Sequence, residues 1–169
     1  MRFRIEQHFE APVDAVERVY TDPAFLERLA ALPKLGRPTL LDRRTDGATI
    51  RQSVRYRFVG DLSSAVRRVV DPARLTWVEE STHDTTTHRT EWRIVPDHYG
   101  SLLRCRGTFV LVAEGPAATR RVAEGDMRVS VPLVGGRVEA AIVSGLEEHA
   151  VLEAEAAADW LDQHGTSGG

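Results

Sequence analysis

The chain has 169 residues and a formal net charge of −3, with 42% hydrophobic and 28% charged residues. This length and composition are typical of one globular domain with a sizeable core. The slightly acidic balance argues against nucleic acid or an anionic membrane surface as a partner, because both attract strongly basic proteins.

The first 32 residues predict a strand followed by two short helices. Residues 2–9 alternate between apolar and polar side chains, which is typical of a half-buried strand. Pro12 and Pro23 each suit the first turn of a helix, and Asp22 is a good N-cap for the second one.

Residues 38–132 carry strand signals only. The alternation is clearest at 48–58, and the turn at 45–47 makes this segment a hairpin with 39–44. Further strands are predicted at 61–70, 75–82, 86–95, 101–113 and 119–131. Short turns join the segments, so we expect an antiparallel meander of seven or eight strands.

Residues 135–164 predict one long helix, which at ~1.5 Å per residue is long enough to cross a whole sheet. Its expected apolar face contains Val138, Ile142, Gly145, His149, Leu152, Ala156 and Trp160. We expect residues 1–164 to form a single domain and residues 165–169 to be a disordered tail.

Three stretches in this order carry a family resemblance: "FEAPVDAVERVYTDPAFLERL", "DPARLTW" and "VGGRVEAAIVSGLEEHAVLEAEAAADWL". The chain resembles the helix-grip (SRPBCC) superfamily of START lipid-transfer domains, polyketide cyclases and aromatases, and birch-pollen allergens. Within it, "VPLVGGRVE" is similar to a family of uncharacterised bacterial proteins. The superfamily usually has seven strands. Either residues 119–131 are therefore an added edge strand, or one predicted strand is wrong.

The resemblance implies an α+β helix-grip fold. A curved antiparallel sheet of seven or eight strands would wrap around the C-terminal helix, with two short helices after the first strand. Superfamily members use the cavity between sheet and helix for lipids, sterols, polyketides or other apolar molecules. If this chain does so, we expect a void of several hundred Å³.

Alternation along the strands and the helix gives a set of candidate ligand-binding residues that face this interior. They are Gln52, Val54, Tyr56, His88, Thr90, Trp92, Cys105, Phe109, Met127, Ile142, Gly145, Leu146 and His149. Most of the apolar members are also ordinary core residues. The polar members are more informative, because buried polar groups need partners and binding pockets contain a few of them.

His149 and Glu153 are the candidate catalytic residues. They are separated by four positions on the helix, so their side chains can touch, and the carboxylate would fix the tautomer of the imidazole. A general acid or base facing the cavity is one interpretation. The plainer alternative, which we prefer, is a histidine at the edge of the core and a glutamate that reaches water at the rim.

A metal site is not predicted, and neither is a cofactor. His83, Asp84 and His88 match no compact zinc pattern, and a tight turn at Asp84 would keep the two histidines from facing each other. The outer sheet face is expected to be solvated and rich in cross-strand ion pairs. It would contain Arg51, Arg55, Arg57, Arg104 and Arg106, interleaved with Glu79, Glu80, Glu91 and Arg93.

Cys105 is the single cysteine, which fits a reducing compartment, and no segment is apolar enough for a signal peptide or a membrane span. We expect a cytoplasmic monomer or homodimer. Three functions stay open: binding of a small hydrophobic or amphipathic ligand, a cyclase/aromatase or dehydratase-like enzyme, and an interaction module without a ligand. No recognisable catalytic signature decides among them.

Overall fold

A computed structural model describes residues 1–33, 35–59, 64–68, 70–133 and 135–165. Within these residues, seven antiparallel strands form one sheet in the order β1-β7-β6-β5-β4-β3-β2. The strands are β1 (Arg2–Phe9), β2 (Thr39–Asp46), β3 (Thr49–Arg57), β4 (Thr76–Asp84), β5 (Arg89–Pro96), β6 (Leu103–Ala113) and β7 (Thr119–Val129).

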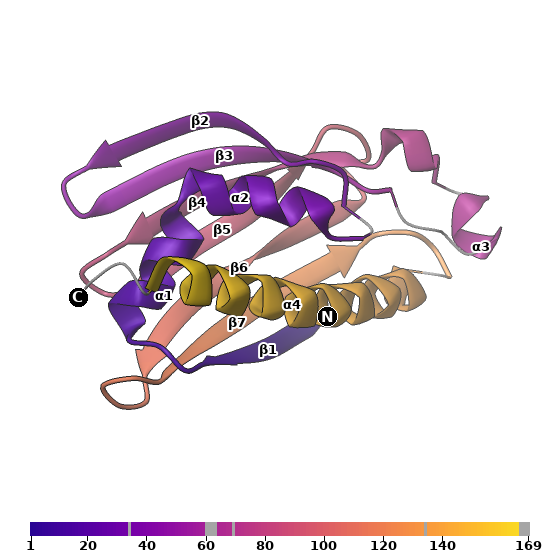
Figure 1. Cartoon of the computed structure of the whole chain (residues 1–169). Coiled ribbons are helices and arrows are strands. Elements are labelled where there is room, and N and C mark those ends of the chain that lie inside the picture. Colours follow the sequence, from indigo (N-terminus) through magenta and orange to yellow (C-terminus); the bar gives the residue numbers. More distant parts are fainter. Residues whose placement is uncertain (34, 60–63, 69, 134, 166–169) are drawn as a thin grey trace.

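Three helices lie on one face of the sheet: α1 (Val13–Thr21), α2 (Pro23–Arg28) and the long α4 (Gly135–Gly165), which runs across the strands (Figure 1). The side chain of Asp22 accepts a hydrogen bond from the backbone N of Ala24 at 2.8 Å, so the predicted N-cap of α2 is confirmed. The remaining elements are α3 (Ser64–Arg67) and the 3₁₀ turns η1 (Leu29–Ala31) and η2 (Pro72–Arg74). This is the predicted α+β helix-grip fold.

One of the eight predicted strands, at residues 61–70, was wrong. The segment 61–70 is helical at α3 and not extended, while residues 60–63 and 69 lie outside the described residues. A short apolar run has the same signal in a strand and in a buried helix, so the pattern alone could not separate them. Residues 119–129 form a genuine strand that pairs with both β1 and β6, and β7 is therefore interior and not an edge.

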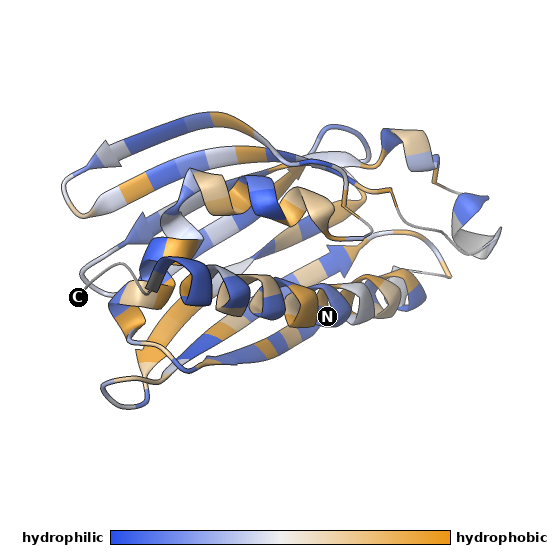
Figure 2. Cartoon of the chain, viewed as in Figure 1, coloured by the Kyte–Doolittle hydropathy of each residue, from blue (hydrophilic) through white to orange (hydrophobic). Residues whose placement is uncertain are grey.

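The two faces of the sheet have different chemistry, which appears as alternating colours along the strands in Figure 2. The outer face carries ion pairs across strands, as predicted: Arg93 and Glu80 are register partners, and their charged groups lie 2.6 Å apart. The inner face meets the helices through two apolar clusters, one on each side of a cavity.

The first cluster joins β1 and β6 to α1, α2 and α4. Its buried members are Phe9, Ala11, Val16, Val19, Phe25, Leu111 and Ala157. Edge-to-face ring contacts extend it, with the rings of Phe25 and Trp160 centred 5.7 Å apart. This cluster fixes α1 and α4 against the sheet.

The second cluster, which we call the dry cluster, consists of Trp92, Cys105 and Met127 with Phe3, Ile94, Leu103, Phe109, Ile142 and Leu146 packed around them. The rings of Trp92 and Phe109 stack at 5.5 Å. Gly107 lies under the Trp92 ring, where a Cβ would collide with the backbone oxygen of Glu124 and with the ring itself. Glycine is required there because the backbone and an aromatic ring approach so closely.

The buried line along α4 is offset from the predicted one. Ala150 and Ala157 are its most buried residues, at 8% and 0% exposure, whereas His149 is only half-buried. The apolar stripe is therefore centred about one position later than the predicted face, and His149 lies on its flank. Residues 166–169 of the predicted tail are outside the described residues. No described helix combines the length and apolar character needed to cross a membrane.

Candidate functional site

A cavity of about 110 Å³ lies between α1 and α2 on one side and β3 to β6 on the other. Glu153 of α4 and Arg121 of β7 close its inner end. Its other polar lining comes from Glu17, Tyr20, Thr21, Asp22, Arg43, Gln52, Tyr56, Glu79, Ser81, His83, His88 and Thr90. The cavity thus brings many polar side chains together within an otherwise apolar interior.

One part of the wall is a carboxylate–histidine cluster made of Glu17, His83 and His88. The Oε1 atom of Glu17 lies 2.7 Å from Nε2 of His83 and 2.9 Å from Nδ1 of His88. An ionised carboxylate can only accept, so both imidazoles donate to the same oxygen. The Nδ1 atom of His83 lies 2.8 Å from the hydroxyl of Thr90, which fixes the ring plane.

A second cluster of polar side chains surrounds Arg121, which is buried. Its guanidinium donates to the side-chain oxygen of Gln7 and lies 3.5 Å from the Glu153 carboxylate. It also lies 4.1 Å from the ring centres of both Tyr20 and Phe109, a cation–π arrangement on two sides. Its charge is therefore offset within the fold by Glu153 and by the two ring faces.

Glu79 is the least compensated charge in the cavity wall. Within the described residues its carboxyl has no hydrogen-bond or ion-pair partner. Burial raises its pKa to about 7, helped by the negative charge of Glu153 and opposed by Arg121. The prediction that Glu79 lies on the outer face was wrong. Because neighbouring strand residues point to opposite faces, Glu79 and Glu80 cannot both face outward.

The hydroxyl of Tyr20 is also poorly partnered. It is buried and meets no partner at full hydrogen-bond geometry among the described residues. Burial, the largest cause, raises the pKa of Tyr20 above its usual range, although the Gln7 side chain lies close enough to lower it. Buried hydroxyls normally have a protein, water or ligand partner. Tyr20 and Glu79 therefore leave the cavity with two polar groups available to a guest molecule.

The structure divides the candidate ligand-binding residues into groups. Gln52, Tyr56, His88, Thr90 and Phe109 line the cavity. Trp92, Cys105, Met127, Ile142 and Leu146 instead form the dry cluster, and burial raises the pKa of the Cys105 thiol to about 12. Val54 is buried within β3, at 1% exposure.

The remaining candidates lie on α4, and two of them, Gly145 and His149, are away from the cavity lining. A Cβ at Gly145 would meet open space, so this glycine does not admit a close strand. The Nδ1 atom of His149 is buried without a hydrogen-bond partner among the described residues. Glu153 does line the cavity, where its ion pair is with Arg121.

Several cavity residues escaped the sequence reasoning, notably Glu17, Tyr20, His83 and Arg121. The reason given for separating His83 from His88 was also wrong. The turn after β4 ends with His88 at a φ of +52°, and this left-handed residue brings its ring to the same carboxylate as His83. The carboxylate that joins them, Glu17, is on α1, more than sixty positions earlier in the chain, so no local motif contains it.

A larger depression on the outer face of the sheet is a weaker candidate. It measures about 1250 Å³, is open to solvent, and is lined mainly by charged residues. Ion pairs such as Arg4 with Glu124 and Arg93 with Glu80 already match many of these charges. We therefore regard it as solvated surface.

Comparisons with known proteins agree with this architecture. The family Protein of unknown function (DUF2505) matches residues 4–161. Among curated proteins, none matches the sequence significantly. The Zhui aromatase/cyclase from Streptomyces sp. R1128 superposes with a TM-score of 0.72 at 14% identity, covering 100% of this chain and 98% of the other.

Two further solved structures share the fold. A protein from Thermus thermophilus gives a TM-score of 0.68 at 20% identity, covering 94% of this chain and 95% of its own. Norcoclaurine synthase from Thalictrum flavum, in complex with dopamine and hydroxybenzaldehyde, gives 0.66 at 18% identity, covering 97% and 87%. At these identities the likeness establishes the fold.

Proposed function

This chain belongs to the helix-grip family Protein of unknown function (DUF2505), and we propose that its cavity binds a small amphipathic molecule. The observation that supports the proposal is a pair of poorly partnered polar groups, the buried Tyr20 hydroxyl and the half-buried Glu79 carboxyl, in the wall of one cavity within the described residues. Leaving a buried polar group unpaired costs about 1–3 kcal/mol, and a bound molecule that pairs with it removes this penalty.

The volume restricts the size of the ligand. At about 110 Å³ the cavity is smaller than the several hundred Å³ that we expected. An apolar cavity of about 150 Å³ is known to hold benzene. The cavity here is smaller than that, so a single small ring is the upper limit for its ligand, and a sterol, a phospholipid or a full polyketide chain is too large for it.

The lining restricts the chemistry. Tyr20 and Phe109 offer ring surfaces beside the Arg121 guanidinium, and Glu79 offers a carboxyl group that is half protonated near neutral pH. A monocyclic aromatic molecule with hydroxyl or amino groups would use both features. Support comes from the norcoclaurine synthase structure of the same fold, which contains dopamine and hydroxybenzaldehyde.

Titration with 4-hydroxybenzaldehyde and with dopamine, followed by calorimetry, tests this proposal. Ser81 lines the cavity from β4, so Ser81→Val fills part of the void and should weaken binding by at least about tenfold. Thr82→Val, the matched change one residue along on the exposed outer face, should leave affinity unchanged. Equal affinity in the two variants, or no binding by the wild-type protein, would contradict the proposal.

Acid–base catalysis is a second candidate, because Glu79 has a pKa of about 7 and faces the cavity. A group that titrates near the working pH is well suited to exchange protons with a substrate. The aromatase/cyclase of the same fold supports this alternative. Consumption of hydroxybenzaldehyde in the presence of dopamine should then depend on pH near 7 and be lost in Glu79→Gln. Consumption no faster than without protein would leave binding as the better account.

A further inference from the structure

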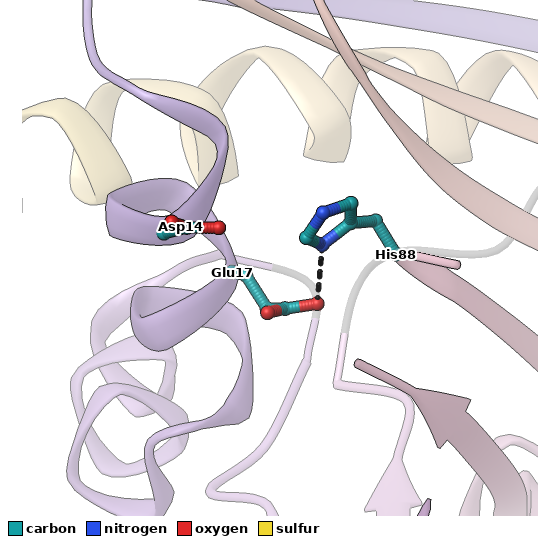
Figure 3. Close-up of side chains that lie close together, drawn as sticks. All are labelled: Asp14, Glu17 and His88. Atoms are coloured by element: carbon teal, nitrogen blue, oxygen red, sulfur yellow. Dashed lines mark hydrogen bonds and ion pairs between the residues drawn. The ribbon is translucent and has the colours of Figure 1, made fainter. Parts of the chain in front are cut away.

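Two carboxylates and an imidazole converge beside the cavity, where α1 faces the turn between β4 and β5 (Figure 3). Asp14, Glu17 and His88 each offer one ligand atom, and these atoms all lie within 4.8 Å of one another. We propose that the three residues bind a divalent transition-metal cation, with Zn²⁺ as the representative ion. Glu17 and His88 also line the cavity, but the observations that support a metal here are separate from those that support a cavity ligand.

The backbone brings these residues together from separate parts of the chain. Asp14 and Glu17 are three positions apart in α1, so their side chains leave the same face of the helix. His88 has a φ of +52°, and its carbonyl accepts a hydrogen bond at 3.0 Å from the backbone N of Leu111 in β6. A left-handed conformation is uncommon for residues other than glycine and often occurs at functional positions. Here it directs the imidazole toward α1.

The charges at this position suit a cation. Asp14 and Glu17 carry two negative charges, and within the described residues neither forms an ion pair with an arginine or lysine. Among these residues, only the imidazoles of His83 and His88 meet Glu17. A divalent cation would neutralise both carboxylates, whereas the two imidazoles reach only the Glu17 carboxylate.

Glu17 is already held in one orientation. The Nε2 atom of His83 donates to its Oε1 at 2.7 Å, and the Thr90 hydroxyl, 2.8 Å from Nδ1, holds the His83 ring in turn. Hydrogen bonds of this kind, made to a ligand from outside the coordination sphere, orient metal-binding carboxylates and strengthen binding. His83 is therefore a positioning residue for the site and not one of its three ligands.

The donor set favours a particular class of ion. One imidazole nitrogen with two carboxylate oxygens suits Zn²⁺, Fe²⁺ or Mn²⁺, whereas Ca²⁺ and Mg²⁺ prefer oxygen ligands alone. Nδ1 of His88 now donates its proton to Glu17, so an incoming cation would replace that proton and release it to solvent. Asp14 is exposed, which gives the ion access from water.

Calorimetric titration of chelator-treated protein with ZnCl₂ tests the site. We expect one Zn²⁺ per chain, bound at least about tenfold more tightly than Mg²⁺. Asp14→Asn and His88→Asn should each weaken binding by about tenfold or more. Asparagine is chosen at position 88 because it tolerates the left-handed backbone, and Asp14 is exposed, so its variant should fold normally.

His8→Asn is the matched control. His8 and Glu114 also form an imidazole–carboxylate pair, with Nδ1 and Oε2 3.3 Å apart, but this pair is exposed and makes no part of the proposed site. The control should bind Zn²⁺ as the wild-type protein does. Wild-type protein that fails to bind Zn²⁺ at about 100-fold excess over protein, or Asp14→Asn that binds with unchanged affinity, would overturn the proposal.

Discussion

The interior of the sheet has two regions of opposite character, the dry cluster and the polar cavity. In the dry cluster, rings from β1, β5 and β6 stack over glycine, and the indole nitrogen of Trp92 is its one buried polar atom without a partner among the described residues. In the cavity, acidic and basic side chains and several hydroxyls line one small void. The same alternating strand pattern produces both. The pattern of one strand shows which of its side chains point inward. Whether those side chains pack tightly or leave a cavity depends on the residues of the neighbouring strands and helices.

The largest effect should come from the dry cluster. Trp92→Ala removes a stacked ring from a tightly packed region and should lower the free energy of unfolding by about 3–5 kcal/mol. Urea denaturation measures this loss. If Trp92→Ala were nearly neutral, the dry cluster would not be the main support of this half of the sheet, and the contrast between the two regions would fail.

A somewhat smaller loss should follow in the cavity from Arg121→Met, at about 3 kcal/mol. This change leaves the Glu153 carboxylate half-buried and without its cation. The double variant Arg121→Met with Glu153→Gln should recover most of the loss, because no unpaired charge then remains. Strictly additive losses in a double-mutant cycle would show that Arg121 acts through packing alone.

Glu79→Gln should increase stability at pH 8 and have little effect at pH 4. The folded-state pKa of Glu79, about 7, lies above the ordinary value of 4.5, so the unfolded chain loses this proton first. Stability therefore falls as pH rises from about 4.5 to 7 and then stays constant, and the total loss is on the order of 3 kcal/mol. Glutamine cannot ionise and avoids this loss.

Denaturation curves of Glu79→Gln and wild type at several pH values give the difference directly. Glu91→Gln is the matched control, since Glu91 is exposed on the outer face. A pH-independent difference between Glu79→Gln and wild type would mean that the Glu79 carboxyl is well solvated. The cavity wall would then not raise the pKa of its carboxyl groups, and in this respect it would behave like the protein surface.

The smallest effect should come from Tyr20→Phe. Removing a buried hydroxyl that meets no partner at full hydrogen-bond geometry among the described residues should change stability by less than about 1 kcal/mol, in the stabilising direction. The ring that lies over Arg121 is retained in this variant. Thermal unfolding measures the change. A clear loss of stability would show that the hydroxyl is already paired, with the Gln7 side chain or a bridging water, and the cavity would then offer one polar group fewer to a ligand.

Sequence patterns predicted the architecture more fully than the site. Alternation predicted that four side chains point into the interior, and in the structure they line the cavity: Gln52, Tyr56, Thr90 and Phe109. This was possible because the side-chain period of a strand is a local property. The segment 61–70 was misassigned because a short run of valines and arginines has no distinctive period.

Charged residues inside the cavity could not be recognised in the same way. Arg121 resembles an ordinary surface residue, and only the packing of β7 and α4 reveals that it is buried. For Glu79, alternation shows that it and Glu80 lie on opposite faces, but not which of them faces the cavity. Glu17 meets His83 and His88 across a distance in sequence that no motif spans. The offset of the α4 stripe, from His149 to Ala150, is likewise set by how the helix rests on the sheet.

The pairing of β1 with β7 has a consequence for folding. Arg2 is the register partner of Asp126, so the first strand of the chain cannot form its ladder until the last strand is available. Contacts between residues so far apart close a long loop and slow the folding of a domain. During synthesis, β2 to β6 can form their hairpins early, while the first strand stays unpaired until β7 emerges. The cavity wall that includes Arg121 is thus completed only late, when both ends of the sheet meet.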